Sequence, residues 1–376
     1  MHIVVNTRLL IKNKLEGIGW FTYQTLKLIT QTHQRVKFTF LFDRPFDEEF
    51  LFSSNVTGVV LGPKARHPFL YYFWLQFKVK PYLEKTKPDL FLSPDGFLCL
   101  NTQIKQLPVI HDINFFHFPK HIKYLTEKYY NYFFPKFAKQ AKRIATVSNY
   151  SKVDISKTYK IDLSLIDVVY NGINSFFKPL NEIDKDKIKK VYSNSNPYFV
   201  YVGAISPRKN ISNLMIAFNT FKKNNPNLNH NLLIAGAVAW GNKEVQQNLN
   251  KLEFKNQIIF TGRLSNTDLA NILSSAEALV YIPLFEGFGI PLIEAMECEV
   301  PVICSNVTSL PEVAGNAAVL VNPLNVNDIS DAMCKIVNEP NLKQSLINNG
   351  NIQKLKFSWE KSAKLLWESV EKTLHN

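Results

Sequence analysis

The sequence predicts an α/β fold of two Rossmann-like domains that face each other across a cleft. Its 376 residues exceed the ~100–200 residues of a typical domain, and 46% of them are hydrophobic, enough for two large cores. In both halves, short runs of β-branched and aromatic residues alternate with segments of helical periodicity, a pattern typical of parallel sheets flanked by helices. The polar stretch 175–197, with a proline near each end, separates the two series and is predicted to be the linker.

The first half is predicted to contain seven strands. Each is a short apolar run between polar or turn-forming residues, beginning with HIVVN at 2–6. The others are predicted at 37–43, 57–61, 89–92, 107–110, 143–147 and 166–169. Because helical segments separate these runs, we expect the strands to be parallel.

The second half repeats this arrangement with six predicted strands, at 198–203, 231–237, 257–262, 278–282, 301–304 and 318–321. A helix is predicted after the first of them, because apolar residues at 214, 217, 218 and 221 share one helical face. At the end of the chain, Ser358 is a good N-cap for a helix with one apolar stripe, formed by Trp359, Ala363, Leu366, Val370 and Leu374. We therefore expect domains at 1–178 and 179–356, with 357–376 packing back on the first domain.

Positive charge is concentrated in the first domain. The net charge is +13, and Lys and Arg exceed Asp and Glu by 12 over residues 1–178 but by only 1 over 179–376. Aromatic rings and cations alternate at helical spacing in 67–82 and 117–143, which suits an anionic membrane surface. The rings expected to insert are Tyr71, Phe73 or Trp74. The same pattern fits ordinary amphipathic helices with their rings in the core, and this alternative stays open.

Several classes of protein are excluded or disfavoured. No apolar run approaches the ~18 residues that span a bilayer, and the first residues lack the pattern of a secretory signal, so we expect a cytoplasmic protein. The four cysteines are scattered, which excludes a disulfide framework and argues against a structural zinc site. We expect Cys99, Cys298, Cys304 and Cys334 to be reduced thiols.

The stretch YIPLFEGFGIPLIEAM at 281–296 is the most informative part of the sequence. A buried strand leads into Glu286, Gly287, Phe288 and Gly289, and a helix is predicted to begin near Ile290. Glycines allow close approach of a ligand, and the first helical N–H groups offer an anion or hydroxyl site. Glu286 and, eight residues later, Glu294 could accept paired hydrogen bonds from a sugar or a ribose. Alternatively, both are acids favoured by the dipole of the helix.

Three further stretches follow predicted strands. VGAISPRKN at 202–210 places Arg208 and Lys209 before a helix, as in a phosphate site, although a solvated basic turn would look the same. Gly17 and Gly19 are predicted to lie in the loop after the first strand, but they do not match GxGxxG. His111 closes a strand at its carboxyl end and is expected to face the cleft, unless it is a packed structural histidine.

Together and in this order, these stretches resemble the family-4 retaining glycosyltransferases of the GT-B fold, and are similar to bacterial O-antigen mannosyltransferases. The defining E-x7-E pattern is present as EGFGIPLIE, and PRKN and the His111–Asp112 pair accompany it. The other matching stretches are RIATVSNYSKVDI (143–155), VVYNGI (168–173), TGRLSNTDLANIL (261–273) and FSWEKSAKLLWESV (357–370). The resemblance covers essentially the whole chain.

The resemblance implies that the second domain binds a nucleotide sugar and the first domain an acceptor. It assigns the donor sugar and its phosphate to Glu286 and to the backbone of Phe288, Gly289 and Ile290. It assigns the ribose to Glu294, the diphosphate to Arg208 and Lys209, and the base to the backbone at 261–263. His111 is expected beside the transferred sugar, and the Gly17–Gly19 loop beside phosphate or acceptor. Many relatives carry arginine where this chain has Ala204, so Arg263 is expected to assist the two cations.

The implied reaction retains the anomeric configuration and needs neither cofactor nor metal. Arg208 and Lys209 would stabilise the departing diphosphate, while His111 and Glu286 orient the sugar. The sequence Asp-Lys-Asp at 184–186 matches a DxD pattern, and we expect its carboxylates to be solvated surface charges. The expected donor is GDP-mannose or a UDP-sugar, and the expected acceptor is a glycan or a lipid-linked glycan of a cell-surface polysaccharide, met at the inner face of the cytoplasmic membrane.

Three alternatives remain at this stage. A nucleotide-sugar epimerase of the same fold would need the same donor contacts and no acceptor. A basic nucleic-acid-binding protein would explain the charge of +13, although no recognised binding module is present and we expect no nucleic-acid partner. A catalytically silent subunit is disfavoured by the intact Glu286, Glu294, Arg208 and Lys209.

Overall fold

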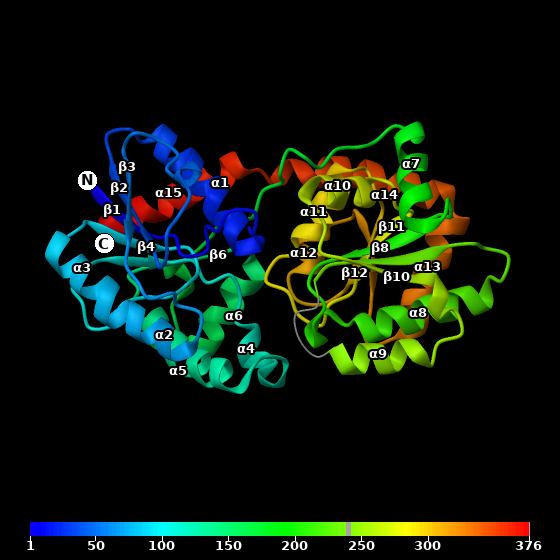
Figure 1. The fold of residues 1–376 in the computed structure, drawn as a ribbon, viewed down its shortest axis with the longest axis horizontal. Coiled ribbons are helices and arrows are strands. Elements are labelled where there is room, and N and C mark those ends of the chain that lie inside the picture. The colour runs from blue at the N-terminus through cyan, green and yellow to red at the C-terminus, as the bar shows by residue number, and fades with distance from the viewer. Residues whose placement is uncertain (238–241, 376) are drawn as a thin grey trace. The chain divides into compact units, whose positions relative to one another are not determined.

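The computed structural model describes residues 1–237 and 242–375, which form two compact units (Figure 1). The first unit comprises Met1–Gly172 and Ser358–Asn376, and the second comprises Ile173–Phe357. The division lies between Gly172 and Ile173, whereas the sequence placed it between 178 and 179. Both units consist of a parallel sheet with helices around it, as the sequence predicted.

The first unit is built on a five-stranded parallel sheet of order β3-β2-β1-β4-β5. Its strands are β1 (His2–Asn6), β2 (Lys37–Phe42), β3 (Val56–Val60), β4 (Leu90–Ser93) and β5 (Gln106–Pro108). A parallel pair, β6 (Ile144–Thr146) and β7 (Ile166–Val168), continues from β5 through the bridge between Val109 and Ala145. Chain order reverses between β1 and β4, which is the point where ligands bind in open α/β sheets.

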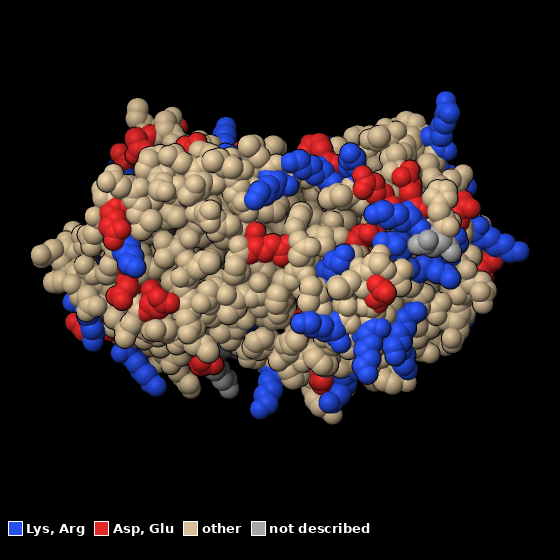
Figure 2. All heavy atoms as spheres, turned by 180° about the vertical axis from the view of Figure 1, so that it is seen from behind, with Lys and Arg blue, Asp and Glu red and all other residues tan. Residues whose placement is uncertain are grey.

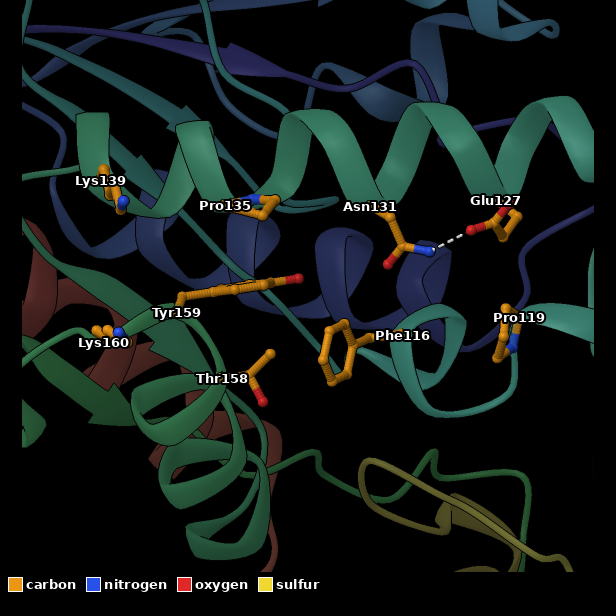
Figure 3. Close-up of a pocket in the computed structure, with 9 residues that line it drawn as sticks. All are labelled: Phe116, Pro119, Glu127, Asn131, Pro135, Lys139, Thr158, Tyr159 and Lys160. Atoms are coloured by element: carbon orange, nitrogen blue, oxygen red, sulfur yellow. Dashed lines mark hydrogen bonds between the residues drawn. The ribbon is translucent and has the colours of Figure 1, made fainter.

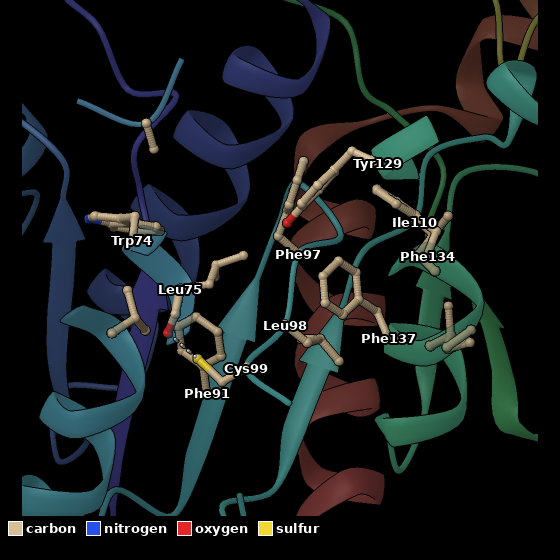
Figure 4. Packing of buried hydrophobic residues seen from close by; sticks show 14 of the residues in the cluster. Trp74, Leu75, Phe91, Phe97, Leu98, Cys99, Ile110, Tyr129, Phe134 and Phe137 are labelled. Carbon is tan, nitrogen blue, oxygen red and sulfur yellow. Dashed lines mark hydrogen bonds between the residues drawn. The ribbon is translucent and has the colours of Figure 1, made fainter. Parts of the chain in front are cut away.

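Helices of the first unit enclose an aromatic core. They are α1 (Gly17–Thr32), α2 (Pro68–Phe73), a π-helix (Trp74–Val79), α3 (Lys80–Thr86), α4 (Asn114–His117), α5 (Tyr124–Gln140), α6 (Asn149–Tyr159) and α15 (Trp359–His375), with short 3-10 turns at Glu48–Phe50, Pro119–His121 and Leu163–Leu165. Figure 4 shows Phe91, Phe97, Phe134 and Phe137 packed between the sheet and these helices. The core therefore holds the strand ends in fixed positions.

The last helix, α15, belongs to the first unit and packs on α1. Leu366 and Val370 are fully buried on its inner face. The ring of Trp367 stacks on His33 of α1 at 3.7 Å between centroids, and Lys105 Nζ donates a hydrogen bond to the carbonyl of Leu374 at 2.6 Å. Consequently, the chain leaves the first unit at Gly172 and returns to it at Ser358.

The second unit contains a six-stranded parallel sheet of order β10-β9-β8-β11-β12-β13. Its strands are β8 (Tyr198–Val202), β9 (Asn231–Ala235), β10 (Ile258–Gly262), β11 (Ala278–Tyr281), β12 (Val302–Ser305) and β13 (Ala318–Val321). Its helices are α7 (Glu182–Ser193), α8 (Ile211–Asn224), α9 (Asn242–Asn250), α10 (Asn266–Ser274), α11 (Ile290–Glu297), α12 (Leu310–Ala314), α13 (Val326–Asn338) and α14 (Pro340–Gln353), with 3-10 turns at Pro207–Lys209, Lys255–Gln257 and Lys354–Lys356. This strand order is that of a Rossmann sheet, and it reverses between β8 and β11.

The prediction of a linker at 175–197 was wrong. Most of that stretch is α7, which packs on α10 within the second unit. Asn181 caps this helix by accepting a hydrogen bond from the Asp184 N–H at 2.9 Å. The DxD carboxylates at 184 and 186 pair with Lys187 and Lys189 on the exposed face of the helix. The high charge that suggested a linker is thus the solvated face of a packed helix.

The surfaces of the two units differ in charge. On the face drawn in Figure 2, Lys and Arg side chains gather over the first unit, as the uneven distribution along the sequence predicted. None of the helices in the described residues combines the length and the apolar character needed to cross a membrane.

Candidate active site

The reversal of strand order in the second unit brings two loops together. The loop after β8 carries Arg208 and Lys209 in a 3-10 turn, and the loop after β11 carries Glu286. The Leu284 N–H donates to the carbonyl of Arg208 at 2.9 Å, which joins the two loops through their backbones. The order of strands in the sheet therefore brings the candidate site residues together.

A single carboxylate oxygen holds both cations. Arg208 Nη1 lies 2.7 Å from Glu286 Oε1, and Lys209 Nζ forms an ion pair with the same oxygen. Arg208 also donates to the carbonyl of Phe285, and Lys209 Nζ donates to the Tyr281 hydroxyl at 2.6 Å. All three charged side chains are largely buried, so their charges interact strongly in a poorly solvated environment.

Glycine and asparagine give the loop after β8 its shape. Gly203 has φ +142°, and a Cβ on Gly236 of the neighbouring loop would lie only 1.8 Å from the Gly203 carbonyl oxygen. Asn210, with φ +62°, ends the turn, and its side-chain amide donates to the carbonyls of Ile282 at 3.1 Å and Pro323 at 2.7 Å. These contacts place the two cations directly before α8.

The E-x7-E stretch forms the start of α11. Gly289 adopts φ +101° at the N-cap, and Ile290 is the first helical residue, as the sequence predicted. Ser309 Oγ donates to the carbonyls of Glu286 at 2.9 Å and Phe288 at 3.1 Å, and the Glu286 N–H donates to Thr308 Oγ1 at 3.2 Å. The loop is thus held from the side of α12. At the start of α11 itself, the Leu292 N–H donates to the Gly289 carbonyl at 3.0 Å, and Pro291 has no N–H.

The two glutamates of this stretch differ in their electrostatics. Burial acts to raise the pKa of Glu286, but the charges of Arg208 and Lys209 outweigh it and hold that pKa below its ordinary value. Burial raises the pKa of Glu294 to about 8, because no cation neutralises its carboxylate. Among the described residues, the Glu294 carboxylate makes no hydrogen bond or ion pair that offsets its burial. Glu286 is therefore a fixed anion, whereas Glu294 is a carboxyl group without a charged partner.

Arg263 lies apart from this cluster in the sheet. Arg263 is exposed and directly follows Gly262, the last residue of β10, and β10 is two strands away from β8 in the sheet. The Gly262 carbonyl accepts a hydrogen bond from the Gly236 N–H at 3.0 Å. The structure therefore joins Arg208, Lys209 and Glu286 directly, and it places Arg263 at a different strand end.

In the first unit, His111 lies beyond the end of β5. Its Nε2 is 2.9 Å from the carbonyl of Pro94, so Nε2 carries the proton in the neutral ring. Phe21 of α1 packs edge-on against the imidazole at 5.1 Å, and burial lowers the His111 pKa. His111 is thus held neutral, with Nδ1 as the hydrogen-bond acceptor.

The predicted position of Gly17 and Gly19 needs a correction. Both lie in the first turn of α1, whereas the sequence placed them in the loop after the first strand. That loop ends at Glu16, the N-cap of the helix. A Cβ on Gly19 would approach Leu15 and the carbonyl of Leu9 at 3.3 to 3.4 Å, so this glycine lets the loop pack closely on the helix.

Sequence reasoning missed other polar residues at both reversal points. In the first unit, Arg8 after β1 pairs with Asp95 after β4 at 2.5 Å, and both are buried. The Asn6 amide also donates to Asp95 at 2.7 Å. In the second unit, Tyr281 at the end of β11 was missed. Their positions in the sequence could have identified these residues as candidates, because each of them ends or closely follows a predicted strand.

The fold is that of the GT-B class of glycosyltransferases, and sequence comparisons agree. The sequence model of "Glycosyltransferase Family 4" matches residues 16–175, and that of "Glycosyl transferases group 1" matches residues 182–353. The two matches cover most of both units. The chain therefore belongs to the family of glycosyltransferases that these two models describe.

Individual relatives support the same assignment. The chain is 25% identical over 360 residues to "O-antigen chain mannosyltransferase B" of Escherichia coli, covering 93% of this chain and 94% of that protein. It is 34% identical over 220 residues to "O-antigen chain mannosyltransferase RfbU" of Salmonella typhimurium, covering 58% of this chain and 57% of that protein.

Solved structures show the same fold. A sucrose-phosphate synthase from Thermosynechococcus elongatus superimposes with a TM-score of 0.80 at 18% identity, covering 99% of this chain and 98% of that one. WaaG, "a glycosyltransferase involved in lipopolysaccharide biosynthesis", superimposes with a TM-score of 0.74 at 12% identity, covering 96% and 97% of the two chains. At these identities the likeness concerns the fold.

Proposed function

We propose that this glycosyltransferase moves a hexose from a nucleoside-diphosphate sugar, GDP-mannose or a UDP-sugar, to a growing cell-surface glycan. The observation that carries the proposal is the cluster of Arg208, Lys209 and Glu286 beside the starts of α8 and α11. Two buried cations next to helix N-termini suit a diphosphate. The names of the O-antigen mannosyltransferase relatives support mannose as the sugar and a surface polysaccharide as the product.

In this proposal the second unit holds the donor. Arg208 and Lys209 bind the diphosphate, assisted by Arg263, and Glu294 accepts hydrogen bonds from the ribose hydroxyls. Glu286, with the backbone of Phe288, Gly289 and Ile290, binds the donor sugar and its phosphate. The low pKa of Glu286 supports its role, because an ionised carboxylate accepts hydrogen bonds from two sugar hydroxyls. The backbone at 261–263 faces the base.

The reaction that we propose retains the anomeric configuration. The bond between the anomeric carbon and the diphosphate oxygen breaks, and the acceptor oxygen bonds to that carbon on the same face while its proton passes to the departing phosphate. Arg208 and Lys209 stabilise the negative charge that develops on the leaving oxygen, a role that needs no metal or other cofactor. Neutral His111 orients the sugar through Nδ1, and the Gly17–Gly19 turn contributes to the phosphate or acceptor site.

We further propose that the first unit binds a lipid-linked acceptor at the anionic inner face of the cytoplasmic membrane. Its excess of positive charge supports this, together with exposed rings on α2 and the π-helix, namely Phe69, Phe73 and Phe77. Of the rings expected to insert, only Phe73 is exposed. Trp74 is buried and donates from Nε1 to the Leu61 carbonyl at 2.5 Å, and Tyr71 packs against Phe97 and Tyr129.

A ligand panel tests the proposed donor. The protein is heated with GDP, UDP, GDP-mannose and UDP-sugars, and a ligand at 100 times its dissociation constant should stabilise it by ~2.7 kcal/mol. The best donor is then incubated with a mannose-terminated acceptor, and NMR of the product reports the anomeric configuration. An inverted product, or release of an epimerised sugar without an acceptor, would contradict the proposal.

A further inference from the structure

A pocket away from the candidate active site lies within the first unit, between α4, α5 and α6 (Figure 3). Its volume is about 430 Å³, within the ~300–1,000 Å³ typical of small-molecule sites. It is lined by residues of all three helices and of the short turns that flank them: Phe116, Pro119, Glu127, Asn131, Pro135, Lys139, Thr158, Tyr159 and Lys160. The roles proposed above involve none of these residues.

Two side chains that line this pocket each have one polar atom without a hydrogen-bond partner among the described residues. The Tyr159 side chain is almost fully buried, at 4% exposure, yet its hydroxyl bonds to no other described residue. Figure 3 shows this hydroxyl pointing into the pocket below α5. Asn131 donates from its amide nitrogen to Glu127 Oε1 at 2.7 Å, while its Oδ1, which Figure 3 shows directed toward the pocket, bonds to none of the described residues.

Pro135, which also lines the pocket, lies inside α5 four residues after Asn131 and has no N–H to donate to the Asn131 carbonyl. A buried polar group without a partner costs free energy, and structures retain such groups mainly where a ligand, an ion or water completes them. The pocket lining therefore includes one acceptor on α5, Asn131 Oδ1, and one phenol on α6, the Tyr159 hydroxyl, that have no partner among the described residues.

We propose that this pocket binds a sugar residue of the glycan acceptor. Sugar hydroxyls can donate to Asn131 Oδ1 and to the Glu127 carboxylate, and they can accept from the Tyr159 hydroxyl. The exposed ring of Phe116 offers an apolar surface for the C–H face of a sugar. The buried groups on α5 are acceptors and include a carboxylate, which disfavours an anion. A phosphate could bond to the exposed Lys139 and Lys160 and to the Tyr159 hydroxyl, but it has no donor for Asn131 Oδ1 and would be repelled by the Glu127 carboxylate.

Saccharide binding follows from the pocket itself, whereas its role in holding the acceptor rests on the proposed function. The test titrates the full-length protein with methyl glycosides and disaccharides of mannose, glucose, galactose and N-acetylglucosamine, and follows binding by saturation-transfer NMR. We expect at least one to bind, and Tyr159→Phe to weaken it about fivefold to tenfold, the effect of one lost hydrogen bond. Because the hydroxyl has no partner among the described residues, the same variant should melt no lower than the wild type.

Tyr129→Phe is the matched control. Its hydroxyl is also buried and without a partner among the described residues, but Tyr129 does not line the pocket, so the control should bind the saccharide as the wild type does. The inference is overturned if no saccharide binds, if both variants weaken binding equally, or if inorganic phosphate competes with the sugar. Nucleoside-diphosphate binding, measured in parallel, separates the two proposals, because the proposed diphosphate ligands Arg208 and Lys209 lie in the second unit and not in this pocket.

Discussion

Glu286 determines how the two cations of the second unit are presented. One of its carboxylate oxygens pairs with both Arg208 and Lys209, which are 78 and 77 residues away in the sequence. Such a pair costs desolvation energy that an apolar pair would avoid, so its retention is better explained by ligand binding than by stability. In the proposed donor complex, the cations would share their charge between the carboxylate and the phosphate oxygens.

Lys209→Ala should therefore weaken nucleoside-diphosphate binding. The lost charged hydrogen bond corresponds to ~1.5–3 kcal/mol in calorimetry with GDP or UDP. Arg208 still neutralises Glu286 in this variant, so the fold should survive. Lys223→Ala is the control, because that lysine forms an exposed pair with Glu253 elsewhere in the second unit. Equal affinities of the two variants would exclude Lys209 as a diphosphate ligand.

Glu294 makes a separate prediction about pH. Its pKa is raised by burial to about 8 in the folded protein, above the ordinary value that applies after unfolding. The stabilising effect of the bound proton is complete below pH ~4.5 and is lost as the pH rises through about 8. Glu294→Gln mimics the protonated side chain, so its free energy of unfolding should fall less with pH than that of the wild type.

The expected difference between the two proteins grows from less than ~1 kcal/mol at pH 5 to a few kcal/mol at pH 8.5, on the order of the pKa shift. Urea unfolding of the ligand-free protein over this range measures it. Glu253→Gln, at an exposed site, should follow the wild-type curve. Parallel curves for wild type and Glu294→Gln would mean that Glu294 is already ionised at neutral pH.

At the scale of elements, periodicity predicted all the strands, because each is a short apolar run that a sheet buries. Periodicity did not predict α7, because this helix is mostly solvated and carries alternating charges and few apolar residues. Residue types and flanking strands identified Arg208, Lys209 and Glu286. Their ion pairs could not be predicted, because they depend on the order of β8 and β11 in the sheet.

The packing of α15 on the first unit also gives a quantitative expectation. Leu366 is completely buried on this helix, so Leu366→Ala should lower the free energy of unfolding by ~2–5 kcal/mol through lost contacts and a cavity. Lys364→Ala, on the exposed face of the same helix, should change it by less than ~0.5 kcal/mol. Chemical denaturation distinguishes the two, and similar small effects would show that α15 is only loosely attached.

At the scale of the whole molecule, the uneven charge is the feature that the fold alone does not explain. The second unit is nearly neutral, and the first carries almost all of the excess of +13. On the first unit, cations lie over exposed rings: Lys136 is 3.4 Å from the ring centroid of Tyr132, and Lys128 is 5.2 Å from that of Tyr124. Rings and cations on α2, the π-helix and α5 together resemble a membrane-interface surface.

This surface predicts salt-sensitive binding to anionic vesicles. Each basic residue near an anionic surface contributes ~1 kcal/mol, and the attraction is screened within ~8 Å at physiological salt. Replacing four exposed lysines of the first unit by glutamine should therefore release most of the protein from phosphatidylglycerol vesicles in a co-sedimentation assay. These lysines are Lys78, Lys128, Lys136 and Lys142. The matched control carries the same change in charge on the second unit, at Lys187, Lys190, Lys223 and Lys255.

The control variant should sediment with the vesicles as the wild type does, because its charge is removed from a unit that we place away from the lipid. Exposed Phe69, Phe73 and Phe77 should add a component that persists at high salt and that disappears when they are replaced by serine. If both lysine variants lose binding equally, the attraction reflects net charge alone. If the wild type ignores anionic vesicles at low salt yet transfers sugar to a soluble acceptor at full rate, the basic unit is a solubilising surface and the acceptor is not presented on a membrane.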